Sequence, residues 1–350
     1  MNRFWQQLQI RSKILEKMKH SSKKMKCRRE SFLITFEPNP GYGEDCYAVS
    51  LNSEYGMMGV FDGCGGLGSR KYEHRENHTG AYIASRLAAR VLGDWFNQSD
   101  FRQLTSEKNV PLLLTQIKEA LIAEFSLEKN ELDQIEPLRI RGSMIKTLPT
   151  TMSMALLDYS RSETIRGLFL WSGDSRCYAL TPQCGLQQIT KDNLTRPLDA
   201  MENLYHDAPL SNMVNADSPF TIHAKQLDFN HPCIIITATD GIFNYFRTPM
   251  DFEYTLLESM DKSKNVQEWN ELFSQCIEEV AEDDSTALVF ISGYASFNEL
   301  KAKFRQRYAL LLNEYISKLD EADMEQTMQL WMQYRDTYEM TGGECREYTA

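Results

Sequence analysis

The sequence contains no apolar run that approaches the ~20 residues needed to span a bilayer. Its first 30 residues lack the apolar core of a signal peptide, because Lys and Arg interrupt them throughout. The eight cysteines include no Cys-x-x-Cys pair, which argues against a disulfide framework in a chain of 350 residues. No internal repeat or low-complexity tract is evident. These absences predict a cytoplasmic protein with reduced thiols and no transmembrane segment.

Charge is distributed unevenly along the chain. The formal net charge is −11, but residues 1–30 carry ten Lys or Arg against two Glu, so the remaining 320 residues carry −19. An acidic body argues against nucleic acid as a partner and suits the binding of metal cations. We expect 1–30 to be a basic N-terminal extension solvated by its charges. An amphipathic segment that touches anionic lipid or an acidic partner is the alternative.

The composition, with 42% hydrophobic and 25% charged residues, is that of a globular protein. Strand-like runs are expected at 31–36, 46–50, 57–61, 149–159, 167–171, 176–181, 233–239 and 287–291. Helical spacing of apolar residues covers 79–97, 110–128 and 266–280. This order predicts an α+β fold, a β-sandwich covered by helices rather than a regular βαβ wind.

The last part of the sequence has a different pattern. Two helical stripes of apolar residues follow one another, the first over 300–319 and the second over 324–338. They predict a C-terminal helical extension over 294–350, built as a helical hairpin. We expect its apolar face to pack on the body of the protein, and contact of these helices with a partner is the alternative.

Acidic residues recur at the ends of the expected strands. Asp62 and Asp240 each close an apolar strand and precede a glycine. Asp174 follows a glycine in a tight turn, whereas 44–45 and 283–284 are acidic pairs just before a strand. Strand ends on one side of a sheet assembly are neighbours, and carboxylates gathered there would repel one another unless divalent cations bound them. A single Asp-Gly is typical of a turn, but the recurrence indicates a metal centre.

Seven short motifs follow one another along the chain, at 44–45, 60–66, 150–151, 173–176, 190–193, 239–241 and 283–286. Their order and spacing resemble those of the type 2C, metal-dependent protein Ser/Thr phosphatases in their compact, bacterial-like form. The resemblance covers about 32–292, so we predict a catalytic domain over 31–293 with both terminal segments outside it. It implies a β-sandwich with helices on both outer faces (αββα) and a two-metal centre at one end.

The resemblance also implies the first metal site. Asp62 would bridge two Mg or Mn ions, and Asp240 and Asp283 would complete one of the two sites. Asp284 stands where the family usually has Asn. Asp284 is therefore expected to support a ligand rather than to be one, with the choice between Asp283 and Asp284 left open.

The second site would be served by Glu44 and the carbonyl oxygen of Gly63, partly through water, with Asp45 supporting them. Asp174 matches the family's carboxylate for a third, weaker metal ion. Two cations that share a carboxylate can activate water for in-line attack on phosphorus and offset charge on the phosphoryl oxygens. We therefore expect hydrolysis of phosphoserine and phosphothreonine on proteins, in opposition to a Ser/Thr kinase.

Two positions depart from the family pattern. Cys64 stands where the family commonly has a His that protonates the leaving oxygen, and Pro40 stands where an Arg often clamps phosphate. Arg70 or Lys71 are candidates to supply the missing phosphate contact, and Arg176 is interpreted as a structural partner of the 173–176 turn. These departures leave two alternatives open. One is a weakly active or inactive phosphatase-like scaffold, and the other is a hydrolase of a small phosphorylated metabolite.

Overall fold

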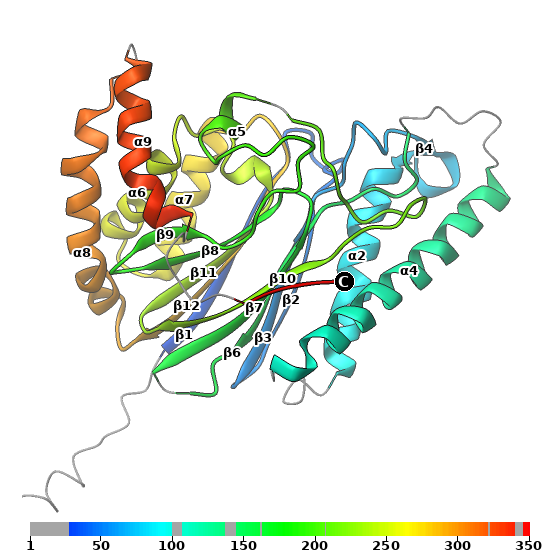
Figure 1. Ribbon diagram of the computed structural model, residues 1–350, viewed down its shortest axis with the longest axis horizontal. Helices are drawn as coiled ribbons and strands as arrows, with labels where there is room; N and C mark the ends of the chain where they lie inside the picture. The colour runs from blue at the N-terminus through cyan, green and yellow to red at the C-terminus, as the bar shows by residue number, and fades with distance from the viewer. Residues whose placement is uncertain are drawn as a thin grey trace, which may run out of the picture.

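The computed structural model describes residues 28–350 except 100–106, 137–144, 162, 207, 321–322 and 340–345. Two β-sheets face each other, and helices cover the outer face of each sheet (Figure 1). The predicted α+β sandwich is thus confirmed. Most of the expected basic extension, 1–27, lies outside the described residues. None of the helices in the described ranges is long and apolar enough to cross a membrane.

The first sheet has five strands in the order β1-β12-β11-β8-β9, and every neighbouring pair is antiparallel. Its strands are β1 (Arg28–Phe36), β12 (Ser285–Tyr294), β11 (Cys233–Ala238), β8 (Arg176–Thr181) and β9 (Gly185–Gln188). The first and the last of these are the sheet edges.

The second sheet has six antiparallel strands in the order β13-β10-β7-β6-β3-β2. They are β13 (Arg346–Thr349), β10 (His223–Asn230), β7 (Thr164–Ser172), β6 (Met152–Asp158), β3 (Tyr55–Phe61) and β2 (Cys46–Leu51). A separate two-stranded ribbon joins β4 (Lys71–Tyr72) and β5 (His78–Thr79).

The alternation of side chains along each strand divides the apolar residues among three cores. In β11, Ile235 points between the sheets, whereas Ile234 and Ile236 point to the helices outside. In β3, Met58 lies in the inter-sheet core and Met57 lies under the opposite helix layer. These strands are apolar on both faces because both faces are covered.

Four helices cover the five-stranded sheet, namely α6 (Pro249–Lys262), α7 (Val266–Val280), α8 (Phe297–Glu314) and α9 (Met324–Tyr338). Two helices cover the six-stranded sheet, namely α2 (Gly80–Gln98) and α4 (Val110–Ile135). In Figure 1 the first group lies at the left and the second at the right. Of these six helices, α6 was not among those the sequence patterns predicted.

The C-terminal segment contributes to both layers. The two predicted helices are present as α8 and α9, and their apolar stripes share one core with the five-stranded sheet. The chain then crosses to the other sheet, where β13 pairs with the edge of β10. The apolar stripe of the hairpin is therefore used within the protein itself. The boundary near residue 294 and the contact of these helices with a partner both stay predictions.

Candidate metal centre

The strand register brings the acidic residues of the six-stranded sheet together. Cys46, the first residue of β2, pairs with Phe61, the last residue of β3. Asp45 and Asp62 therefore stand next to each other just beyond the sheet. The amide of Gly63 donates to the carbonyl of Glu44 at 3.2 Å, which extends this pairing by one step.

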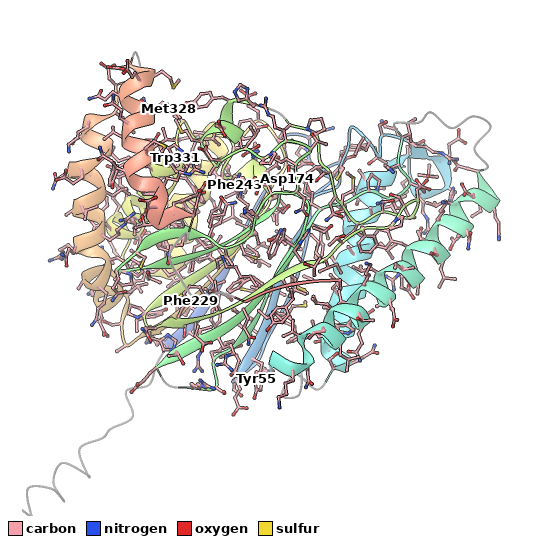
Figure 2. The ribbon with its side chains drawn as sticks, in the orientation of Figure 1. Tyr55, Asp174, Phe229, Phe243, Met328 and Trp331 are labelled. Atoms are coloured by element: carbon pink, nitrogen blue, oxygen red, sulfur yellow. The ribbon has the colours of Figure 1, made fainter. Side chains whose placement is uncertain are left out.

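The same end of the five-stranded sheet carries the remaining acidic positions. Ala238, the last residue of β11, pairs with Arg176 on one side and with Ala287 on the other. Asp240 thus lies between the turn that contains Asp174 and the loop before β12 that contains 283–284. Figure 2 shows Asp174 at the end of the sandwich opposite Tyr55, where β3 begins.

Hydrogen bonds join the two sheets across this end. The hydroxyl of Thr239 donates to Asp45 Oδ2 at 2.7 Å and accepts from the amide of Thr286 at 2.9 Å. The amide of Glu44 donates to Asp284 Oδ2 at 2.6 Å. Asp284 therefore holds the backbone of Glu44, as expected of a supporting residue, whereas Asp283 is exposed.

The carboxylates perturb one another strongly. Burial, followed by the negative charges of Asp240 and Asp45, raises the pKa of Asp62 well above its usual value. Burial raises the pKa of Asp240 to about 6, with Asp283 adding to the effect. The pKa of Asp174 is also raised well above its usual value, first by burial and then by Asp240. These shifts follow from the strand register and the hydrogen bonds that gather the carboxylates at one end of the sandwich.

The cluster fits hard divalent cations by its donor chemistry. Its side-chain donors are carboxylate oxygens, which Mg²⁺ and Mn²⁺ prefer. The buried oxygens Asp45 Oδ1 and Asp174 Oδ1 have no hydrogen-bond partner in the described part of the chain. A buried carboxylate oxygen without a donor is costly, and a cation would compensate both oxygens.

The side chains are not arranged as a finished ligand set. Within the described ranges, no three His, Cys, Asp or Glu side chains take up positions that would hold a metal ion. Several carboxylates instead accept hydrogen bonds from neighbours: Glu44 accepts from the hydroxyl of Thr79, and Asp240 Oδ2 accepts from Asn244 Nδ2 at 3.2 Å. These two carboxylates are thus held by hydrogen bonds within the chain.

Threonine hydroxyls anchor the backbone at Asp62. The Asp62 carbonyl accepts from Thr150 Oγ1 at 2.8 Å and from the amide of Thr151 at 2.7 Å. Thr151 Oγ1 accepts from the amide of Asp62 at 3.1 Å and is 2.6 Å from Ser175 Oγ. The 150–151 motif therefore positions Asp62 and connects it to the turn that carries Asp174.

Two glycines of the cluster lie very close to neighbouring atoms. A Cβ at Gly65 would overlap Glu44 Oε2, the end of a flexible side chain, whereas a Cβ at Gly241 would overlap the backbone carbonyl oxygen of Asp284. Neither glycine has a positive φ. At 240–241 the Asp-Gly pattern that first suggested a turn thus reflects dense packing around the carboxylates.

Cys64 faces the same cluster. Burial raises the pKa of its thiol well above the usual value, and the charges of Asp62 and Asp174 add to the shift. The thiol therefore stays protonated at neutral pH, and a group with so high a pKa is a weak general acid.

The nearby cations have distinct roles. Arg176 is buried and donates to both carboxylate oxygens of Asp192, Nη2 to Oδ2 at 2.6 Å, which matches its interpretation as a structural partner. Arg70 lies over the ring of Tyr72 and donates to the carbonyl of Glu136.

Sequence reasoning missed Arg86, a cation close to Glu44. Arg86 Nη2 donates to the carbonyl of Gly43 at 3.0 Å, and its charge lowers the pKa of Glu44 against the larger effect of burial. It also missed Thr79, which caps α2 by accepting from the amide of Tyr82. A Thr before a helical pattern is a recognisable signal, but nothing local connects it to Glu44.

Comparison with known proteins places this geometry in context. The family model described as Protein phosphatase 2C matches residues 44–282. Stp1 from Staphylococcus aureus, a serine/threonine phosphatase, superposes with a TM-score of 0.56 at 16% identity, over 75% of this chain and 95% of that chain. A bacterial serine phosphatase gives 0.54 at 14% identity, over 77% and 99%. The S. agalactiae serine/threonine phosphatase gives 0.50 at 15% identity, over 75% and 99%. Comparison with curated proteins gives no match.

Proposed function

Because the chain belongs to the protein phosphatase 2C family, we propose that it is a metal-dependent phosphatase acting on phosphoserine and phosphothreonine in proteins. The observation that carries the proposal is the cluster of partly buried carboxylates from both sheets, whose pKa values are raised by burial and by one another. A cluster of this kind stores electrostatic repulsion that binding of divalent cations would relieve.

We assign the residues that would hold the ions as follows. Asp62 would be a ligand common to two Mg²⁺ or Mn²⁺ sites, and Asp240 and Asp283 would complete one of them. Glu44 and the carbonyl of Gly63 would serve the other. Its supporting residues would be Asp45, held by Thr239, and Asp284, held by the amide of Glu44. Asp174 would serve a third ion.

The ions would activate water as the nucleophile and offset the charge of the phosphoryl oxygens. The residues of the chain orient this centre. Thr150 and Thr151 fix the backbone of Asp62, and Thr239 and Thr79 direct carboxylate oxygens by hydrogen bonds. Since the Cys64 thiol is a weak acid, we assign protonation of the leaving oxygen to solvent.

The test is hydrolysis of a phosphothreonine peptide with Mn²⁺, with EDTA, and in the variants Asp62→Asn and Asp240→Asn. We expect kcat/KM to fall by at least about a hundredfold in each variant, because each loses a metal ligand. Asp228→Asn is the matched control, since this exposed carboxylate on β10 pairs with Arg166 away from the cluster. Activity that survives EDTA and both substitutions would contradict the proposal.

One observation favours a second function. Cys64, whose thiol stays protonated, stands where the family commonly has a His to protonate the leaving oxygen. Pro40 stands where an Arg often binds the phosphate. The absence of both side chains is what a phosphatase-like scaffold would show. Mn²⁺ binding by calorimetry, without turnover of phosphopeptides or of a small aryl phosphate, would support that reading. Turnover of the aryl phosphate alone would point to a small-molecule substrate. An opposing Ser/Thr kinase remains part of the leading proposal.

A further inference from the structure

Helix α9 lies beyond the residues that match the family model, yet it reaches back toward the carboxylate cluster. Trp331 is fully buried in the core that α9 shares with the five-stranded sheet. Its indole Nε1 donates to Asp199 Oδ2 at 3.2 Å, and Arg335 Nη1 lies 3.1 Å from the same oxygen. Two side chains of α9 therefore converge on one carboxylate, which is itself only 8% exposed.

Asp199 also forms hydrogen bonds at the start of the short helix α5 (Glu202–Tyr205). Its other oxygen, Oδ1, accepts from the amides of Met201 at 3.0 Å and Glu202 at 2.8 Å. The carbonyl of Asp199 accepts from the amide of Asn203 at 2.9 Å. The side chain of Asn203 then donates from Nδ2 to Asp192 Oδ2 at 3.1 Å.

Asp192 is the partner of the Arg176 guanidinium, which is the end of this chain of contacts. A second route from α9 reaches the same arginine. The hydroxyl of Tyr338 donates to the hydroxyl of Tyr178 at 3.5 Å, and Tyr178 accepts from Arg176 Nη1 at 3.3 Å. The guanidinium also lies over the ring of Phe243. Figure 2 labels Phe243, Asp174 and Trp331 in the upper part of the view, opposite Tyr55.

Arg176 lies next to two residues of the carboxylate cluster. It follows Asp174 by two residues, and it pairs in the sheet with Ala238, two residues before Asp240. Its guanidinium is buried and is held by Asp192 and Tyr178, so these contacts also fix the turn that carries Asp174. The elements that hold Arg176 therefore influence where Asp174 and Asp240 lie.

We propose that α9 is a positioning element of the metal centre. Through Asp199, Asn203 and Asp192, and through Tyr338 and Tyr178, it fixes the Arg176 guanidinium and with it the turn that carries Asp174. It thereby sets the divalent-cation affinity of that side of the cluster. The inference rests on the proposed function, since it presumes that these carboxylates bind metal.

The test measures Mn²⁺ binding to protein dialysed against EDTA, by isothermal titration calorimetry. Asp199→Asn keeps Oδ1 for the two amides but replaces the acceptor of Trp331 and Arg335 with an amide nitrogen. We expect the dissociation constant of at least one Mn²⁺ site to rise on the order of three- to tenfold. Loss of a direct support of a metal ligand typically costs tenfold or more, and Asp199 acts indirectly, through Asn203, Asp192 and Arg176. The Mn²⁺ concentration for half-maximal activity should rise in parallel, with kcat at saturating Mn²⁺ nearly unchanged.

Three further variants and a control separate positioning from folding. Asn203→Ser and Tyr338→Phe each interrupt one of the two routes and should each weaken Mn²⁺ binding. Arg335→Lys, which keeps a cation near Asp199, should bind Mn²⁺ nearly as the wild type does. Met332→Ala is the control, because this residue of α9 is 57% exposed.

The outcomes are distinct. A lower melting temperature with an unchanged Mn²⁺ dissociation constant in both Asp199→Asn and Asn203→Ser overturns the inference and makes α9 a stabilising element only. A wild type that binds Mn²⁺ but hydrolyses no phosphopeptide overturns the proposed function, while the binding comparison still decides the inference. A wild type that binds no Mn²⁺ overturns both.

Discussion

At the scale of single residues, the cluster depends on groups that are not ligands. The hydroxyl of Thr239 directs Asp45, and the Asp284 carboxylate accepts from the amide of Glu44. Gly65 and Gly241 leave space that any side chain would fill. Such neighbours decide whether carboxylates point into one centre or apart.

Gly65→Ala tests whether close packing beside Gly65 positions the Glu44 side chain. The added methyl group would meet the end of the flexible Glu44 side chain, so Glu44 must move while the backbone stays in place. We expect about a tenfold loss of Mn²⁺ affinity, with the melting temperature nearly unchanged, as measured by calorimetry and thermal melts. Gly66→Ala is the matched control, because nothing lies within 4 Å of a Cβ there. Equal affinities in the two variants would refute the role given to Glu44.

At the scale of helices and strands, a buried ion pair connects α6, α8 and α9. Arg307 of α8 donates to both oxygens of Glu253 of α6, Nε to Oε1 and Nη2 to Oε2, each at 2.7 Å. The hydroxyl of Tyr334 of α9 donates to Glu253 Oε2 at 2.6 Å. The guanidinium also fills the space beside Gly185, the first residue of β9. The C-terminal helices are therefore held by a polar contact within an apolar core.

Arg307→Ala should lower the free energy of unfolding by about 3–5 kcal/mol, because it leaves the Glu253 carboxylate buried without its cation. Urea titration followed by tryptophan fluorescence measures the loss. Arg305→Ala, two residues earlier on the exposed side of α8, should change stability by less than about 0.5 kcal/mol. Adding Glu253→Gln to Arg307→Ala should recover part of the loss. A small effect of Arg307→Ala alone would show that the pair is dispensable.

At the scale of the whole molecule, the acidic cluster links stability to pH and to metal. Burial raises the folded-state pKa of Asp240 from 3.8 to about 6. Between these values the folded protein binds more protons than the unfolded chain, so stability falls as pH rises through this window. The contribution is fully present below pH ~4 and lost above pH ~6. Metal binding at the ionised carboxylates should offset this loss at neutral pH.

We therefore expect the melting temperature of EDTA-treated protein to fall between pH 5 and pH 7, by roughly 2–5 °C more than in Asp240→Asn. Added Mn²⁺ should raise the melting temperature more at pH 7 than at pH 5, because protonated carboxylates bind metal poorly. Calorimetric scans with and without Mn²⁺ measure both effects. An Mn²⁺ effect that is larger at pH 5 would contradict the assignment of the cluster as the metal centre.

The sequence by itself predicted most of the main elements in their order and the acidic residues that we propose as ligands. The β8 and α7 predictions have the observed bounds, because an apolar run and a helical stripe are local patterns. It left α6 unpredicted, although Thr248 and Pro249 are a recognisable helix start, and it left the largely polar strand β10 unassigned.

Only the tertiary structure decided what surrounds the acidic residues. The contact of Thr239 with Asp45 spans 194 positions in the chain, and that of Trp331 with Asp199 spans 132. No local pattern encodes such pairs, because they form only when the two sheets and their helices pack. The pairing of Glu44 with Thr79 and of Arg176 with Asp192 follows from the same packing. Residue spacing thus determined which carboxylates to expect, and folding determined which groups direct them.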